Sequence, residues 1–385
     1  AITLAPARRS PGQGPVPPGD RASRGKGEFA RRVAAWQAEH GRHDLPWQRD
    51  PDPYRVWLSE VMLQQTQVAT VIPYYERFVA RLPDVGALAA ASEDEVLALW
   101  SGLGYYSRAR NLHRCAKLVV ERHGGRFPSD PAGLAALPGI GRSTAAAIAV
   151  FAFGGRAAIL DGNVRRVLAR VFGVEGDPAS VATQRRLWEI AERELPGRDL
   201  PGYTQGLMDL GATVCTRARP ACARCPVSGL CEALATDRID ELPGRRRRRA
   251  SPLREAVLLV VRGEAGLFLV KRPADGIWGG LWSVPEVSLA RPGDEEATAP
   301  AMVLDAAAGL AGELGLASAP RRVLPAFEHV FTHFRLRAHP VLVDARGAPS
   351  RIAAEPASGR WWREDEIAGA PLPAPIRTLI ESLPA

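Results

Sequence analysis

Four of the five cysteines lie within one short segment whose spacing is typical of a metal site. They are Cys215, Cys222, Cys225 and Cys231. Zinc is the default ion for four cysteine ligands, but structural zinc sites usually take paired CxxC hairpins, and this segment holds one. A single compact loop favours a [4Fe–4S] cluster, although the spacing alone leaves zinc open. The odd number of cysteines and the clustering of four of them indicate a metal site in a reducing compartment and not a disulfide framework.

The stretch from Leu137 to Asn163 combines a phosphate-binding turn with a carboxylate. Gly139 and Gly141 free the backbone, so that its N–H groups can converge on one point. The positive end of a helix predicted over 142–153 faces the same point, which suits a phosphate. Asp161 follows an apolar run and precedes the next helix, which indicates chemistry on a nucleic acid. The alternative is a glycine-rich helix start with an ordinary Asp N-cap.

Glu60 lies inside a strongly apolar helical pattern over residues 54–66. Helical spacing places it near Trp57, Val61 and Gln64, so we expect the carboxyl group to be partly desolvated. Desolvation raises the pKa of a carboxylic acid and suits a general acid. The alternative is that Glu60 points to solvent or pairs with Arg55.

A glycine turn over residues 102–110 has the composition of a DNA wedge. It presents Leu103, Tyr105 and Tyr106, which can insert into a base stack, followed by Arg108 and Arg110, which can hold a phosphate backbone. The alternative is a helix start with buried tyrosines. Cys115, in the following helix, is expected to pack as a small hydrophobic residue.

The elements that position these residues divide the chain into a helical part and an α+β part. Helices are predicted over 28–40, 68–81, 85–91, 93–100 (capped by Ser92), 164–171, 183–194 and 203–211. After residue 254 we expect strands over 256–262, 267–272, 281–285, 334–343 and 360–362, with helices over 302–314 and 375–383. With 385 residues, two domains are the natural expectation.

Composition agrees with an anionic partner. The net charge is +8 and the pI is near 9.6. Lysine occurs only at positions 26, 117 and 271, so almost all of the positive charge is arginine. No apolar run is long enough to span a membrane, and residues 1–25 have the composition of a disordered tail and not of a secretory signal. Five consecutive arginines, 245–249, lie in a polar linker over 233–254.

Several motifs together resemble the adenine DNA glycosylase (MutY) family. They are WLSEVMLQQT at 57–66, GLGYY at 102–106, LPGIG at 137–141 with DGN at 161–163, and the four cysteines. The resemblance is colinear over about 28–231. WGGLW at 278–282 and FEHVFTHF at 327–334 resemble the lesion-recognition domain of that family, which has a Nudix-like fold. The domains implied are a tail over 1–25, a helix-hairpin-helix glycosylase over 26–232 with a [4Fe–4S] loop at 215–231, a linker over 233–254, and an α/β/α sandwich over 255–385.

The resemblance implies a monomeric, cytoplasmic enzyme, bacterial in type and associated with the nucleoid. It would remove adenine mispaired with 8-oxoguanine or guanine in double-stranded DNA, after flipping the base out of the duplex. Glu60 would protonate N7 of adenine, Asp161 would stay ionised and stabilise the sugar cation, and Asn163 would orient the site. Ser143 stands where strand-cutting relatives place a Schiff-base lysine, which predicts a monofunctional enzyme.

Further roles follow from the same resemblance. It implies DNA contacts for Gln65, Thr66, Leu103, Tyr105, Gly139, Gly141 and Ser143, an adenine pocket with Trp47 and Gln205, and lesion recognition by Phe331, Thr332 and His333. The family often has Ser where this chain has Thr332. A Nudix hydrolase needs clustered glutamates to hold Mg²⁺, and the helical stretch near 305–315 offers only Asp305 and Glu313, so we expect that domain to bind and not to hydrolyse.

Four other functions compete with this one. An endonuclease III-like enzyme for oxidised pyrimidines is disfavoured by Ser143 and Glu60. A thymine mismatch glycosylase would differ in the base that it releases. A catalytically idle DNA-binding module is disfavoured because both carboxylates are present, and a Nudix hydrolase because the acidic cluster is missing.

Overall fold

The computed structural model describes residues 27–244, 251–289, 299–316, 321–331, 333–346 and 359–383. The predicted tail over 1–25, the arginine run at 245–249 and Thr332 lie outside these residues. The chain forms two compact units, which are described separately. Unit 1 comprises Ala1–Pro51, Ser129–Ala135 and Gly141–Arg246, and unit 2 comprises Asp52–Pro128, Ala136–Ile140 and Arg247–Ala385. The domain limits predicted from the sequence stay a prediction.

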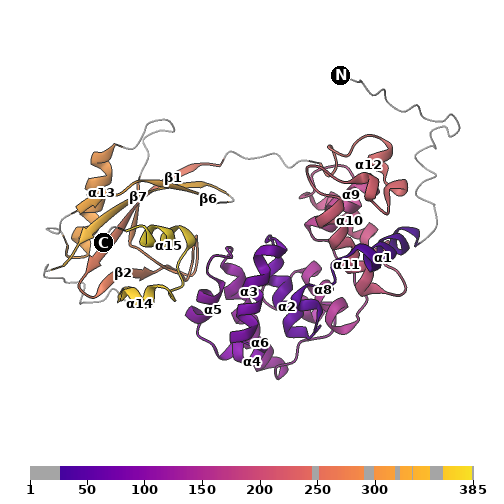
Figure 1. The fold of residues 1–385 in the computed structure, drawn as a ribbon, viewed down its shortest axis with the longest axis horizontal. Coiled ribbons are helices and arrows are strands. Elements are labelled where there is room, and N and C mark those ends of the chain that lie inside the picture. Colours follow the sequence, from indigo (N-terminus) through magenta and orange to yellow (C-terminus); the bar gives the residue numbers. More distant parts are fainter. Residues whose placement is uncertain are drawn as a thin grey trace, which may run out of the picture. The chain divides into compact units, whose positions relative to one another are not determined.

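Unit 1 is helical in its described part (Figure 1). Its elements are α1 (Glu28–His40), η1 (Pro46–Gln48), α7 (Pro131–Ala135), α8 (Arg142–Phe153), α9 (Gly162–Val171), α10 (Val181–Arg193), α11 (Leu200–Asp209), η2 (Leu210–Val214), η3 (Cys222–Arg224), η4 (Ser228–Leu230) and α12 (Glu232–Ala235). The apolar faces of α1, α9, α10 and α11 share one core, which includes Phe29, Leu168 and Tyr203. This packing fixes α9 and α11, which carry the polar residues considered below.

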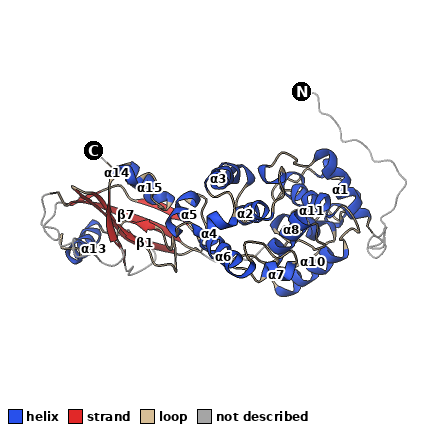
Figure 2. Ribbon diagram, turned by 90° about the horizontal axis from the view of Figure 1, so that it is seen from below, coloured by secondary structure: helices blue, strands red, loops and turns tan. Residues whose placement is uncertain are grey.

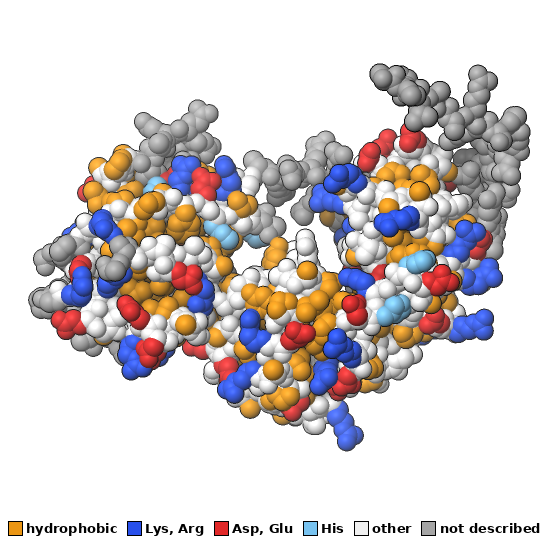
Figure 3. Space-filling model, viewed as in Figure 1, with side chains coloured by type: hydrophobic (Ala, Val, Ile, Leu, Met, Phe, Trp, Pro, Cys, Tyr) orange, Lys and Arg blue, Asp and Glu red, His pale blue; other side chains and the backbone are white. Residues whose placement is uncertain are grey.

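Unit 2 begins with five helices, drawn in blue with the other helices in Figure 2. They are α2 (Pro53–Leu63), α3 (Val68–Arg81), α4 (Val85–Ala90), α5 (Glu93–Trp100) and α6 (Ser107–His123). Trp57, Phe78 and Trp100 are fully buried among them. The Ser92 hydroxyl accepts a hydrogen bond from the Glu95 N–H at 3.1 Å, which confirms the predicted cap of α5. Acidic and basic side chains are interspersed with apolar ones over these helices in Figure 3.

The remainder of unit 2 is built on one mixed sheet, drawn in red in Figure 2. Its strands are β1 (Leu253–Gly263), β2 (Gly266–Lys271), β3 (Trp282–Ser283), β4 (Glu286–Leu289), β5 (Arg321–Val323), β6 (Phe327–Val330), β7 (Arg335–Asp344) and β8 (Gly359–Trp362). The long strands β1 and β7 are parallel, and the other pairs are antiparallel. Helix α13 (Pro300–Glu313) packs its alanine face on this sheet through Val303, Ala307 and Ala311. Helices α14 (Glu364–Ile367) and α15 (Ala374–Glu381) follow.

The predicted elements are confirmed with small shifts at their ends. The predictions for α1, α3, α5 and α8 match the observed bounds. The short strands β4, β5 and β6 were missed, because three or four residues give no readable alternation. Cys115 is fully buried, as expected for a small apolar side chain. None of the described helices is both long and apolar enough to cross a membrane.

Candidate active site and DNA-contacting loops

Asp161 is the N-cap of α9. The apolar run before it, Ala158 to Leu160, is buried, so the chain reaches α9 from the core of unit 1. The Asp161 carboxylate accepts a hydrogen bond from the Val164 N–H at 2.7 Å. Ser143, in the first turn of α8, accepts one from the Leu160 N–H at 2.9 Å. Ser143 therefore helps to fix the backbone that presents Asp161.

Burial dominates the electrostatics of Asp161. It raises the pKa of the carboxyl group above its ordinary value, while the N–H groups of Val164 and Asn163 and the charges of Arg166 and Arg165 lower it. The net direction is upward. Asp161 is thus the N-cap of α9, as the alternative interpretation predicts, and also a carboxylate whose charge desolvation opposes. Its ionised state during a reaction and its role in chemistry stay predictions.

Helix α9 connects this carboxylate to the cysteine segment. Arg166 donates from Nη2 to Asn163 Oδ1 at 2.8 Å and to the Gly211 carbonyl at 2.6 Å, and from Nε to the Cys215 carbonyl at 2.7 Å. A Cβ on Gly211 would lie 2.6 Å from the Cβ of Asn163, so only glycine permits this approach. Asn163 is therefore fixed from the side of the cysteine segment.

The four cysteines line one cavity among apolar side chains of unit 1. Burial raises the thiol pKa of Cys222, Cys225 and Cys231, with neighbouring cysteines adding to the rise, and Cys225 reaches about 11. The guanidinium of Arg170 donates to Cys215 Sγ at 3.4 Å. Within the described residues, no three His, Cys, Asp or Glu side chains are already arranged around a common ion position. The donor set nevertheless fits a thiolate-bound group, since all four cysteines line one cavity beside the buried Arg170.

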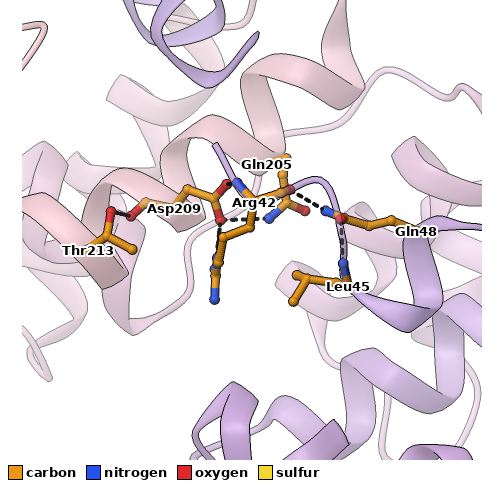
Figure 4. Close-up of polar contacts among 6 residues, drawn as sticks. All are labelled: Arg42, Leu45, Gln48, Gln205, Asp209 and Thr213. Atoms are coloured by element: carbon orange, nitrogen blue, oxygen red, sulfur yellow. Dashed lines mark hydrogen bonds and ion pairs between the residues drawn. The ribbon is translucent and has the colours of Figure 1, made fainter. Parts of the chain in front are cut away.

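Gln205 belongs to a hydrogen-bonded network in unit 1 (Figure 4). Its amide nitrogen donates to the buried carboxylate of Asp209 at 2.8 Å, and Arg42 forms an ion pair with the same carboxylate at 2.6 Å. Gln48 donates to the Arg42 carbonyl at 3.1 Å, and the Leu45 N–H donates to Gln48 Oε1 at 3.2 Å. These contacts hold the segment that carries Trp47, whose side chain is buried.

Glu60 lies on α2 in unit 2 and is half-buried. Its neighbours along the helix, Trp57 and Val61, are buried. The expectation of a carboxylate flanked by apolar side chains is therefore confirmed. Glu60 and Asp161 belong to different units, and each is placed here within its own unit.

Arg108 holds two loops of unit 2 together from inside. Its side chain is buried and donates to six acceptors. They are the carbonyl oxygens of Val61, Met62, Gln64, Leu103 and Gly104 and the Thr66 hydroxyl. Desolvation lowers the pKa of Arg108 to about 10. The expectation that Arg108 contacts a DNA backbone is wrong in this structure, because its guanidinium is committed to the protein.

Both of these loops contain a strained residue. Gln65 has φ 59° and Tyr105 has φ 48°, a left-handed conformation that costs a non-glycine residue about 1 kcal/mol or more. Tyr105 is 45% exposed, whereas Leu103 and Tyr106 are buried. The turn thus presents Tyr105 alone and not all three apolar side chains. The strain lies at two of the predicted DNA contacts, beside Thr66 and Leu103.

In the predicted phosphate turn, Gly139 has a backbone conformation that favours glycine and Gly141 does not. Gly139 has φ 80°, and a Cβ there would lie 2.8 Å from the Cβ of Asn111. Gly141, the N-cap of α8, has φ −84° and open space around it. The expectation that both glycines serve an unusual conformation is therefore wrong for Gly141. The Gln64 amide donates to the Gly139 carbonyl at 3.4 Å, which links this turn to the loop after α2.

Phe331 sits in an aromatic cluster at the end of β6. Its ring centroid lies 5.3 Å from that of Trp278, 4.6 Å from that of His329 and 4.6 Å from that of Phe334. Burial lowers the pKa of His329 below its ordinary value, which favours the neutral imidazole. His333 is exposed, and Thr332 lies outside the described residues.

Sequence reasoning did not find Asp209 or assign the correct role to Arg108. Both are buried charges whose partners come from distant segments or from the backbone. No local sequence pattern indicates such partners. The one indication in the sequence is a charged residue at an apolar position of a helix, as with Glu60.

Two sequence profiles that match this chain give its class, a helix-hairpin-helix DNA repair protein with a Nudix-like C-terminal part. A sequence profile described as the HhH-GPD superfamily of base excision DNA repair proteins matches residues 58–193, and a NUDIX domain profile matches 256–382. A solved thermostable thymine-DNA glycosylase is 30% identical with a TM-score of 0.50, covering 54% of this chain and 95% of its own.

Curated relatives narrow this class further. The adenine DNA glycosylase of Buchnera aphidicola (subspecies Schizaphis graminum) is 31% identical over 353 residues, which cover 92% of this chain and 98% of that protein. The adenine DNA glycosylase of Rattus norvegicus is 38% identical and covers 80% of this chain and 69% of its own. The chain belongs to the adenine DNA glycosylase family, and it is a DNA glycosylase of base excision repair.

Proposed function

We propose that this enzyme hydrolyses the N-glycosidic bond of adenine mispaired with 8-oxoguanine or guanine. The observation that carries the proposal is Asp161, a half-buried carboxylate held at the start of α9 between helix N–H groups and arginine charges. Such a carboxylate stabilises positive charge that develops on a deoxyribose. The flipped adenine would be accepted between Trp47 and Gln205.

Two carboxylates divide the chemistry. Glu60 protonates N7, so that adenine leaves as a neutral base and the bond to C1′ breaks with both electrons on the base. Asp161 stabilises the resulting sugar cation, directly or through a transient adduct. Water then adds to C1′, displacing Asp161 where an adduct has formed, and its proton passes to the carboxylate of Glu60, which restores the acid. Asn163, fixed by Arg166, orients the site.

The four cysteines are proposed to hold one [4Fe–4S] cluster. A bound cluster would cross-link the segment 215–231 and so stabilise its fold. Arg166 and Arg170 both donate to Cys215, through its carbonyl and sulfur respectively. The order of α9 would then depend on the loaded segment. Iron and acid-labile sulfide in the purified protein, about four of each per chain, check this assignment.

We propose that the enzyme is monofunctional. Ser143 accepts a backbone hydrogen bond and offers no amine for a Schiff base. Of the two lysines in the described part, Lys271 is paired with Asp94 at 2.6 Å and Lys117 lies on α6. Efficient borohydride trapping on an abasic product would contradict this proposal.

The DNA contacts are proposed from loops of both units. Gln65, Thr66 and Tyr105 would insert into or border the gap left by the flipped base, and Gly139, Gly141 and Ser143 would hold the backbone. In the C-terminal part, Phe331, Thr332 and His333 would read 8-oxoguanine. The strained turns at Gln65 and Tyr105 support this assignment, since such strain gathers at functional sites.

The experiment compares matched duplexes under single-turnover conditions. Adenine release from 8-oxoguanine:adenine and guanine:adenine duplexes supports the proposal. The likeness to a thymine-DNA glycosylase favours one competing function, so a guanine:thymine duplex is included. Release of thymine but not adenine would overturn the proposal. Near-normal adenine release by Glu60→Gln or Asp161→Asn would remove the assigned roles.

A further inference from the structure

Asp209 is a buried carboxylate in an unfavourable place. It lies where α11 continues directly into the helical turn η2, and its side chain is 1% exposed, so burial opposes its charge. Three donors compensate for this. Arg42 donates from its backbone N–H to Oδ2 at 2.8 Å and from Nε to Oδ1 at 2.8 Å. Gln205 donates to Oδ1 at 2.8 Å.

This arrangement fixes which end of the Gln205 amide faces Asp209. An ionised carboxylate only accepts hydrogen bonds, so Nε2 must face it and Oε1 must face away. The backbone of Gln205 is also immobilised. A Cβ on the next residue, Gly206, would lie 2.9 Å from Val33 Cγ1 and 3.0 Å from Gln37 Cβ, so α11 lies directly against α1.

The same carboxylate anchors the segment that carries Trp47. Arg42 precedes η1, and its carbonyl accepts from the Gln48 side chain while its guanidinium pairs with Asp209 (Figure 4). The amide of Gln205 and the segment of Trp47 therefore share one anchor. Both residues line the adenine pocket in the proposed function, on which this inference rests.

We propose that Asp209 is a positioning residue that presents Gln205 Oε1, a hydrogen-bond acceptor, to the flipped base. Adenine has an amino donor at its 6-position, whereas guanine and hypoxanthine have an oxygen acceptor there. A fixed acceptor attracts the amino group and repels the 6-oxygen. Asp209 thereby selects 6-aminopurines without touching the base.

The test measures the ratio of adenine to hypoxanthine release from duplexes that differ only in the target base opposite guanine. Asparagine at position 209 can donate as well as accept, so in Asp209→Asn the Gln205 amide can turn. We expect the ratio to fall about 10-fold. The double variant Asp209→Asn/Gln205→Glu exchanges amide and carboxylate and restores a presented acceptor. We expect it to recover the ratio.

Two further variants separate positioning from general damage. Arg42→Met removes the ion pair and keeps the hydrogen bond between Gln205 and Asp209. The rates of adenine release and of hypoxanthine release therefore fall together, and their ratio stays the same. Gln205→Leu removes the acceptor and lowers the ratio, and it carries the test if Asp209→Asn does not fold. An unchanged ratio in folded Asp209→Asn, or in Gln205→Leu, overturns the inference. If the wild-type protein releases no adenine from any duplex, the proposed function fails instead.

Discussion

Asp161 and Asp209 are carboxylates of the same unit in different helical settings. Asp161 begins α9, where helix N–H groups stabilise negative charge, and its carboxylate bonds to one of them. Asp209 lies where α11 continues into η2, and its charge is balanced by an arginine and an amide. Burial still raises the pKa of Asp161 above its ordinary value.

In the proposed function, this difference separates a carboxylate for chemistry, Asp161, from a carboxylate for positioning, Asp209. Asp209 is saturated by donors, so little of its charge is available to a ligand. Asp161 is compensated incompletely, and a developing sugar cation would supply the missing positive charge. The comparison predicts that the same change, Asp to Asn, has opposite consequences at the two sites.

The largest expected effect is on catalysis. Asp161→Asn retains a cap for α9, because asparagine is also a good N-cap, but removes the charge. We expect the single-turnover rate of adenine release to fall about 10³–10⁴-fold. Asp199→Asn is the matched control, since Asp199 caps α11 by accepting from the Gly202 N–H at 3.3 Å. An equal loss in both variants would show that capping, not charge, matters at Asp161.

Arg108 extends the comparison to a buried charge bonded to neutral acceptors. Arg108→Ala leaves five carbonyl groups without their donor, so we expect a loss of about 3–5 kcal/mol in the free energy of unfolding. We also expect faster amide exchange in the loops around Gln64 and Leu103. Arg122→Ala, at an exposed position on the same helix, is the control and should change stability by less than about 0.5 kcal/mol. A melting temperature of Arg108→Ala equal to that of the wild type would mean that the two loops do not need the hydrogen bonds from Arg108.

Asp209→Asn should destabilise the protein, in contrast to Asp161→Asn. Arg42 would lose its charge partner inside the network, at a cost of about 1–3 kcal/mol. Denaturant unfolding at neutral pH measures it. A melting temperature equal to that of the wild type would show that the Arg42–Asp209 ion pair only offsets the cost of its own desolvation. Asp161→Asn and Asp209→Asn would then differ in catalysis and not in stability.

The sequence predicted most elements and the identity of the chemical groups. Long amphipathic helices such as α3 and α10 have a clear period, and the caps Ser92 and Asp161 mark their own helix starts. The cysteine cavity and the half-buried setting of Glu60 also followed from local spacing. These features depend on residues close to one another in the chain.

Features that depend on distant partners did not follow from the sequence. Arg108 has the pattern of a DNA-binding residue, and its burial depends on carbonyl oxygens of α2, more than 40 residues away. Leu103 and Tyr106 turn inward because the backbone of their turn is held by Arg108 and by the Tyr106 hydroxyl. Every residue has a backbone carbonyl oxygen, so the residue types do not indicate which carbonyl groups accept from Arg108. The sequence therefore could not show that Tyr105 is the exposed side chain of this turn.

The smallest expected effect tests the sign of the Asp161 electrostatics. Because the pKa of Asp161 in the folded protein lies above the ordinary 3.8, ionisation of this group destabilises the fold. The stability difference between Asp161→Asn and the wild type should therefore be constant in acid below about pH 3.8 and shift in favour of the variant as the pH rises through the folded-state pKa. At neutral pH we expect the variant to melt at a higher temperature than the wild type. The measurement is a series of melting curves from pH 3 to pH 8 for both proteins.

A stability difference that shifts in favour of the wild type with rising pH would mean that the arginines and helix N–H groups outweigh the desolvation of Asp161. Asp161 would then be as fully compensated as Asp209, and the contrast between the two carboxylates would disappear.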